Sequence, residues 1–138
     1  MKKTILFICT HNSARSQMAE GLINSFFNDK FKAYSAGTEV AFVRPQTITV
    51  MKEIGIDISN HRSKHMKEFY GTKFDLAITV CDKAQKICPV FPGAKKNIHK
   101  SFLDPSAAMG TEEQKLEVFR EVRDQIRKWL EEDLISLL

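Results

Sequence analysis

Short strand-like segments and helical segments alternate along this chain of 138 residues. The strand-like segments are brief runs at residues 4–9, 32–37, 74–81 and 95–100. Helices are expected from Ser16 onward, from Pro45 to Gly55, over 64–70, and from a capping box of Thr111 and Gln114 onward. Because helical segments separate the strands, this order predicts a parallel α/β sheet.

The composition excludes several classes of protein. Hydrophobic residues make up 43% and charged residues 28%, and the net charge is only +4. This weak charge suits a small anionic ligand, and no nucleic-acid recognition motif accompanies it. The apolar run near the N-terminus is too short for a signal peptide, and no run reaches the roughly 18 residues of a membrane span. We therefore expect one cytoplasmic domain over 1–138 that binds neither nucleic acid nor membranes.

The segment Cys-Thr-His-Asn-Ser-Ala-Arg-Ser, residues 9–16, joins the first strand to the first helix. Cys9 ends that strand at the edge of the sheet where α/β proteins bind ligands. The loop N–H groups, the helix N-terminus and the guanidinium of Arg15 can together surround a tetrahedral oxyanion. The same positive field favours the reactive thiolate of Cys9, and Ser16 can donate a hydrogen bond to its sulfur.

The backbone of this loop supplies most of the expected anion contacts. The candidate oxyanion-binding residues are therefore Thr10, His11, Asn12, Ser13, Ala14 and Arg15. Asn12 suits a loop of unusual conformation, because asparagine tolerates a positive φ. The alternative is a buried cysteine that happens to precede a surface arginine. A strand before, a helix after and a hydroxyl directly after the arginine favour the anion loop.

With these residues the chain resembles the low-molecular-weight protein tyrosine phosphatase family. The resemblance rests on the Cys-x5-Arg-Ser loop and, in order, on residues 35–38, 55–63 and 103–105. It implies a three-layer sandwich with a four-stranded parallel sheet flanked by helices. Within the family, residues 9–21 look most like the arsenate reductases that take electrons from thioredoxin. The resemblance also implies that Asp104 is the general acid that protonates the leaving oxygen. The alternative is a turn residue before Pro105.

Cys81 and Cys88 separate a reductase from a phosphatase, because hydrolysis needs only one cysteine. Reduction of arsenate to arsenite needs two electrons, which two thiols supply by forming a disulfide. The resemblance implies a relay: Cys9 forms a thiol–arsenate adduct, Cys81 attacks Cys9 and releases arsenite, and Cys88 then attacks Cys81. Thioredoxin or a similar redoxin would reduce the final disulfide, no cofactor would be bound, and the role would be arsenic detoxification. The alternative is two unrelated core thiols.

The relay makes two geometric demands. If the first and third strands are neighbours, Cys9 and Cys81 can come within disulfide range. If residues 81–88 form a helix, Cys81 and Cys88 lie about 10 Å apart along its axis, so we expect this segment to unwind on oxidation.

Two further functions stay open beside arsenate reduction. One is a phosphatase that hydrolyses phosphate monoesters through a Cys9 phosphoenzyme. The other is a catalytically idle anion-binding domain. Tyrosine-directed phosphatases of this fold usually carry aromatic residues after the Asp-Pro pair. Ser106 and Ala107 stand there instead, which favours a small inorganic oxyanion.

No metal ion is expected. Some relatives bind potassium beside Asn12 with a threonine and an acidic residue, where this chain has Arg62 and Lys64. Two cations there would repel a potassium ion. One of the two positive side chains could take the place of the ion. Alternatively, Arg62 could simply be solvated. The four histidines match no zinc-ligand spacing, so hydrogen-bonded or solvated histidines are expected. We expect the protein to be a monomer.

Overall fold

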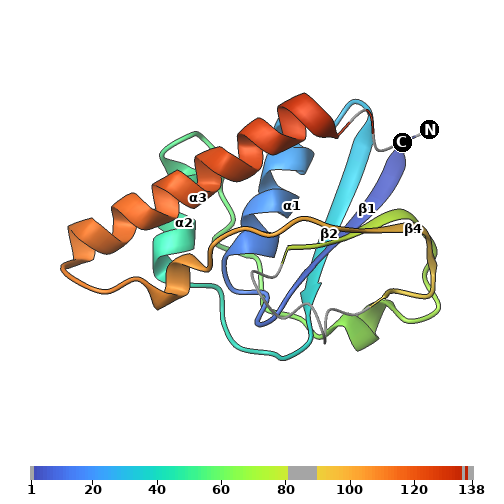
Figure 1. The fold of residues 1–138 in the computed structure, drawn as a ribbon, viewed down its shortest axis with the longest axis horizontal. Coiled ribbons are helices and arrows are strands. Elements are labelled where there is room, and N and C mark those ends of the chain that lie inside the picture. Colours follow the sequence, from blue (N-terminus) through green and yellow to red (C-terminus); the bar gives the residue numbers. More distant parts are fainter. Residues whose placement is uncertain (1, 81–89, 135, 137–138) are drawn as a thin grey trace.

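The computed structural model describes residues 2–80, 90–134 and 136, and within them four parallel strands form one sheet (Figure 1). The strands are β1 (Lys3–Cys9), β2 (Phe31–Gly37), β3 (Phe74–Thr79) and β4 (Ala94–His99), in the spatial order β2-β1-β3-β4. Cys9 at the end of β1 pairs with Gly37 of β2, and Ile8 pairs with Thr79 of β3. The predicted parallel sheet is confirmed, and the first and third strands are neighbours as expected.

The third strand is shorter than predicted. It ends at Thr79, two residues before the expected end at 81. The N–H of Val80 still donates to the carbonyl of Ile8 at 2.8 Å, so the chain continues beside β1 for one more residue. Cys81 and Cys88 lie outside the described residues.

Three α-helices cover one face of the sheet: α1 (Arg15–Phe26), α2 (Pro45–Lys52) and α3 (Glu112–Asp133) (Figure 1). Their apolar residues share a core with alternate residues of the strands, including Ile5 and Phe7 of β1. The predicted capping box begins α3, because the Thr111 hydroxyl accepts from the Gln114 N–H and the Gln114 side chain accepts from the Thr111 N–H. Gly55, with φ of +83°, follows the end of α2.

The opposite face has a thinner cover. The short helix expected over 64–70 is the 3₁₀ helix η1 (Met66–Phe69), and it packs with aromatic rings of the sheet. The Phe69 and Phe74 rings meet edge to face at 5.8 Å, and the Phe74 and Phe91 rings at 5.5 Å. Because both faces are covered, residues 5–8 of β1 are completely buried. The predicted three-layer α/β sandwich is confirmed.

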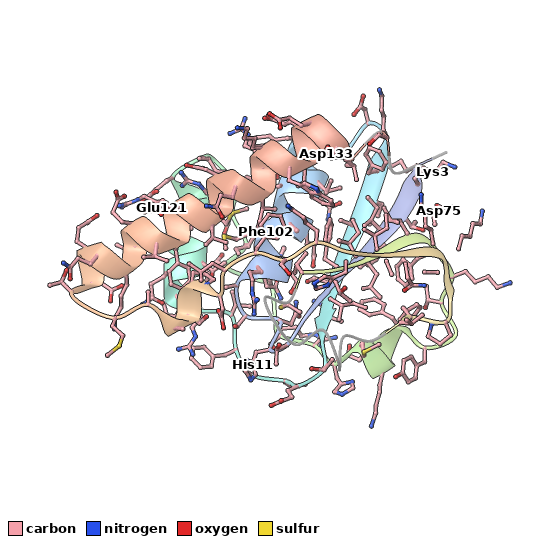
Figure 2. All side chains as sticks on the ribbon, in the orientation of Figure 1. Lys3, His11, Asp75, Phe102, Glu121 and Asp133 are labelled. Atoms are coloured by element: carbon pink, nitrogen blue, oxygen red, sulfur yellow. The ribbon has the colours of Figure 1, made fainter. Side chains whose placement is uncertain are left out.

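The carboxyl ends of the strands lie together at one end of the molecule. Figure 2 shows His11 at this end, and Lys3 and Asp75, near the beginnings of β1 and β3, at the other. A second 3₁₀ helix, η3 (Pro105–Ala107), follows β4 in the chain and precedes α3. No helix in the described part of the chain is both long and apolar enough to cross a membrane.

Candidate active site

The loop between β1 and α1 turns sharply at Asn12, whose φ of +52° confirms the predicted left-handed conformation. Asn12 is completely buried, and its side chain ties the loop to three partners. Its Oδ1 accepts from Gln17 Nε2 at 3.0 Å and from the N–H of Lys64 at 2.9 Å. Its Nδ2 donates to Ser16 Oγ at 2.7 Å. These contacts hold the loop curved.

Close backbone packing also fixes the loop. Gly37, at the end of β2, has no room for a side chain: a Cβ there would lie 2.6 Å from the carbonyl oxygen of Thr10 and 2.9 Å from the N atom of Asn12. The N–H of Thr38 donates to the carbonyl of Cys9, and the N–H of Glu39 donates to the carbonyl of Thr10. The loop is therefore anchored on β2 as well as on α1.

The thiol of Cys9 lies inside this loop and is only 2% exposed. Its Sγ is 2.9 Å from Ser16 Oγ, in the first turn of α1. Asn12 donates to this oxygen, and the Ser16 hydroxyl proton is available to a Cys9 thiolate, which has no proton of its own to donate. A hydroxyl that donates in this way stabilises a thiolate nucleophile.

Arg15 connects the loop to two other parts of the site. Its side chain is buried, and Nη1 donates to the carbonyls of Phe102 at 3.2 Å and Val80 at 3.4 Å. Its Nη2 lies 3.6 Å from Oδ2 of Asp104, while Oδ1 of Asp104 accepts from the N–H of Ser106 at 2.9 Å. Asp104 thus caps η3, as the turn interpretation expects, and also faces the arginine of the anion loop.

A cavity of about 280 Å³ opens beside the loop. Its walls come from the loop, from the connection between β2 and α2, and from η3 with the residue before it. The lining residues are His11, Ser13, Ala41, Arg44, Asp104, Ser106 and Ala107. A buried thiol, a curved anion loop, a buried arginine and a carboxylate at the mouth of a cavity are together suited to nucleophilic attack on an oxyanion.

This geometry agrees with the comparison to known protein families. A family described as low molecular weight phosphotyrosine protein phosphatase matches residues 4–137. The chain belongs to the low molecular weight phosphotyrosine protein phosphatase family. The membership confirms the family resemblance inferred from the anion loop.

Relatives within this family include arsenate reductases. That of Halalkalibacterium halodurans is 47% identical over 92% of this chain and 91% of its own. That of Bacillus subtilis is 45% identical over 94% of both chains. Among solved structures, an arsenate reductase in the phosphate binding state has a TM-score of 0.82 at 34% identity, over 97% of both chains. A thioredoxin-dependent arsenate reductase of Corynebacterium glutamicum has a TM-score of 0.70 at 25% identity, over 98% of this chain and 63% of that one.

Sequence reasoning missed the buried polar residues behind the family's anion loop. Gln17 Nε2 donates to the carbonyl of Asn12 at 3.2 Å and to that of Arg62 at 2.9 Å, and Gln17 Oε1 accepts from His61 Nδ1 at 2.9 Å. On the other side of the loop, Thr47 Oγ1 donates to the carbonyl of Ser13 at 3.1 Å. The one signal in the sequence is a polar residue, Gln17, directly before the first apolar residues of the first helix. The structure shows that Gln17 is completely buried.

The two cations expected near Asn12 have different surroundings. Arg62 is exposed and forms a two-pronged ion pair with Glu68, at 2.9 and 2.6 Å, so it is occupied at the surface. Lys64 is largely buried, with Nζ 3.2 Å from the carbonyl of Arg62 and 4.0 Å from Oε1 of Glu20. Burial lowers the pKa of Lys64, and the charge of Glu20 opposes that shift. Lys64 is thus the cation that borders the loop scaffold.

No group of three or more His, Cys, Asp or Glu side chains among the described residues is arranged to hold a metal ion. The histidines have other partners: His99 Nδ1 lies 2.9 Å from Thr79 Oγ1, and His11 Nε2 lies 3.5 Å from a Glu39 oxygen.

Of the predicted catalytic residues, the structure brings together Cys9, Arg15, Ser16 and Asp104.

Proposed function

We propose that this protein is an arsenate reductase in which Cys9 attacks the arsenic of a bound arsenate. The similarity to arsenate reductases over more than nine-tenths of the chain supports the substrate. The loop from Thr10 to Ala14 presents backbone N–H groups to the oxyanion, and Arg15 adds a fixed positive charge with parallel donors. Ser16 stabilises the thiolate.

The first chemical step forms the Cys9 sulfur–arsenic bond and breaks one arsenic–oxygen bond. Asp104 gives its proton to the departing oxygen, which leaves as water. Arsenic remains pentavalent at this point. The position of Asp104 on the wall of the cavity beside the anion loop supports this role.

The second step is the reduction. Cys81 attacks the sulfur of Cys9, the sulfur–arsenic bond breaks, and its electron pair stays on arsenic, which leaves as arsenite. Cys88 then attacks Cys81, and this exchange frees Cys9 and leaves a Cys81–Cys88 disulfide. Two thiols have then given up two electrons and two protons, so the reduction balances.

The observation that carries this proposal is the strand order. β3 lies directly beside β1, and Val80, the residue before Cys81, bonds to Ile8, the residue before Cys9. Neighbouring parallel strands are about 4.8 Å apart, within the range over which a disulfide joins two Cα atoms. The described chain thus brings the end of β3 beside the end of β1, as a relay from Cys81 to Cys9 requires.

The electron donor that fits best is thioredoxin or a similar redoxin, as in the thioredoxin-dependent relative from Corynebacterium glutamicum. A small redox protein reduces an exposed disulfide by the same thiol exchange. Such a relay works only where thiols are kept reduced, so we propose that the protein is cytoplasmic. We propose a monomer, because the relay needs no residue from a second chain.

The test is a thiol count on the reduced protein. With arsenate, wild type should lose two of its three thiols, and mass spectrometry should find a Cys81–Cys88 link. The Cys88→Ser variant should stop at a Cys9–Cys81 link after one turnover. Three intact thiols in wild type after arsenate treatment would refute the reductase proposal.

The alternative is a phosphatase, which the family membership favours, whereas the anion loop and Asp104 suit both activities. It predicts steady hydrolysis of para-nitrophenyl phosphate that survives Cys88→Ser, with no thiol loss on addition of arsenate. An idle anion-binding domain would show neither activity.

A further inference from the structure

One hydroxyl group at the site has no partner. Among the residues that the structure describes, Ser106 Oγ is the only buried side-chain nitrogen or oxygen atom without a hydrogen bond. Ser106 lines the cavity of about 280 Å³ beside the anion loop. A buried hydroxyl without a partner is unfavourable, so its position on the wall of a ligand-sized cavity points to a ligand as its missing partner.

The chemistry of the site indicates what that partner is. In an in-line displacement, the departing oxygen lies opposite the attacking Cys9 sulfur. With three oxygens of the oxyanion held by the loop and Arg15, the fourth would face outward, toward Asp104 and the cavity. Asp104 and Ser106 are adjacent on this wall, and the N–H of Ser106 holds the Asp104 carboxylate in place.

We propose that Ser106 Oγ binds the fourth, outward-facing oxygen of arsenate and thereby selects inorganic oxyanions over aryl esters. This inference rests on the proposed function and adds a specificity residue to it. The hydroxyl donates to the oxygen that departs as water when the sulfur–arsenic bond forms. The proton for that water still comes from Asp104, so Ser106 keeps its own proton throughout the step.

The same geometry disfavours an aryl ester. In an aryl phosphate the fourth oxygen carries the ring, accepts hydrogen bonds poorly and cannot donate one. The ring would cover the Ser106 hydroxyl and leave it unpaired, and a site with an unpaired polar group rejects such a ligand. The other wall offers little compensation, because the Arg44 guanidinium already lies over the Phe42 ring at 5.0 Å.

The experiment measures ligand binding without turnover. In the full-length Cys9→Ser protein, calorimetry gives the Kd of arsenate and of phenyl phosphate, with and without Ser106→Ala. We expect the arsenate Kd to rise about three- to tenfold, as for loss of one hydrogen bond, while the phenyl phosphate Kd stays unchanged or falls. Ser101→Ala, on the connection that leads from β4 to η3 and not lining this cavity, is the matched control and should change neither value.

Two results would overturn the inference. One is an arsenate Kd that stays within twofold in Ser106→Ala. The other is equal weakening of both ligands, which a purely structural effect on Asp104 would produce. Urea unfolding of each variant confirms that it is folded. Because no redox step is involved, the binding result is independent of the thiol count that tests the reductase.

Discussion

Oδ2 of Asp104 lies 3.6 Å from Nη2 of Arg15, so the connection after β4 meets the first turn of α1 across the anion loop. The arginine is fixed by the carbonyls of Phe102 and Val80, and the carboxylate is fixed by the N–H of Ser106. The side chains that we propose as the cation for the oxyanion and as the acid for its leaving oxygen are thereby held in one arrangement. Each can be tested separately.

Replacing Asp104 with Asn should remove the proton donor and leave the site intact. The amide oxygen can still accept from Ser106, so η3 stays capped. We expect the arsenate-dependent loss of thiols to slow by about 10²- to 10⁴-fold, the usual contribution of a general acid. Hydrolysis of para-nitrophenyl phosphate should slow much less, because nitrophenolate leaves without a proton.

The matched control is Asp57→Asn, because Asp57 Oδ1 accepts from the N–H of Ser59 in the same way, at 2.9 Å, on the exposed surface. It should leave both rates unchanged. If Asp104→Asn slowed both reactions by the same factor, Asp104 would be a positioning residue and not the acid.

Replacing Arg15 with Lys should keep the charge and lose the planar pair of donors. We expect the kcat/KM for arsenate to fall about 100-fold, since a single ammonium cannot hold two oxyanion oxygens and the backbone carbonyls together. Steady-state kinetics at fixed ionic strength measures this. Arg62→Lys, at an exposed ion pair with Glu68, is the control and should change kcat/KM less than twofold. A wild-type rate for Arg15→Lys would mean that charge alone suffices.

Two replacements of Asn12 should separate its backbone from its side chain. Asn12→Gly accommodates the φ of +52° but loses the side-chain hydrogen bonds to Ser16, Gln17 and the Lys64 N–H. This variant should lower the free energy of unfolding by about 1–2 kcal/mol. Asn12→Ala also carries strain at positive φ, and should lower it by about 1 kcal/mol more. Urea titration measures both, with the exposed Asn60→Ala as control. Equal losses for Gly and Ala would show that φ is unimportant here.

Asp75 should make stability depend on pH. Its carboxylate accepts from the Thr4 N–H at 2.8 Å, and this bond holds the pKa of Asp75 below its ordinary value of 3.8, although burial opposes the shift. The unfolded chain therefore binds more protons between the two pKa values, so stability falls as pH falls through that window. Relative to Asp75→Asn, wild type should be about 1–2 kcal/mol more stable at pH 7, and the difference should shrink as the pH falls below the ordinary pKa of 3.8.

Unfolding measured at pH 7 and at pH 3 tests this, with the exposed Asp29→Asn as control. A difference between wild type and Asp75→Asn that is the same at both pH values would show that the Asp75 charge is not responsible.

The parts of this protein that depend on local interactions followed from the sequence alone. The order of strands and helices, the capping box of Thr111 and Gln114, the positive φ of Asn12 and the loop that joins Cys9 to Arg15 all rest on residues close together in the chain. Propensity, capping and the short list of residues that tolerate positive φ decide such features.

Only the tertiary structure decided what depends on contacts between distant segments. It placed α1, α2 and α3 on one face of the sheet, and it supplied Gln17 and His61 as buried supports of the loop. It also left Ser106 Oγ unpaired beside Asp104. A sequence pattern shows which residues are polar, but their burial and partners depend on how the whole chain packs, since a buried polar group is stable only with the partner that the fold or a ligand provides.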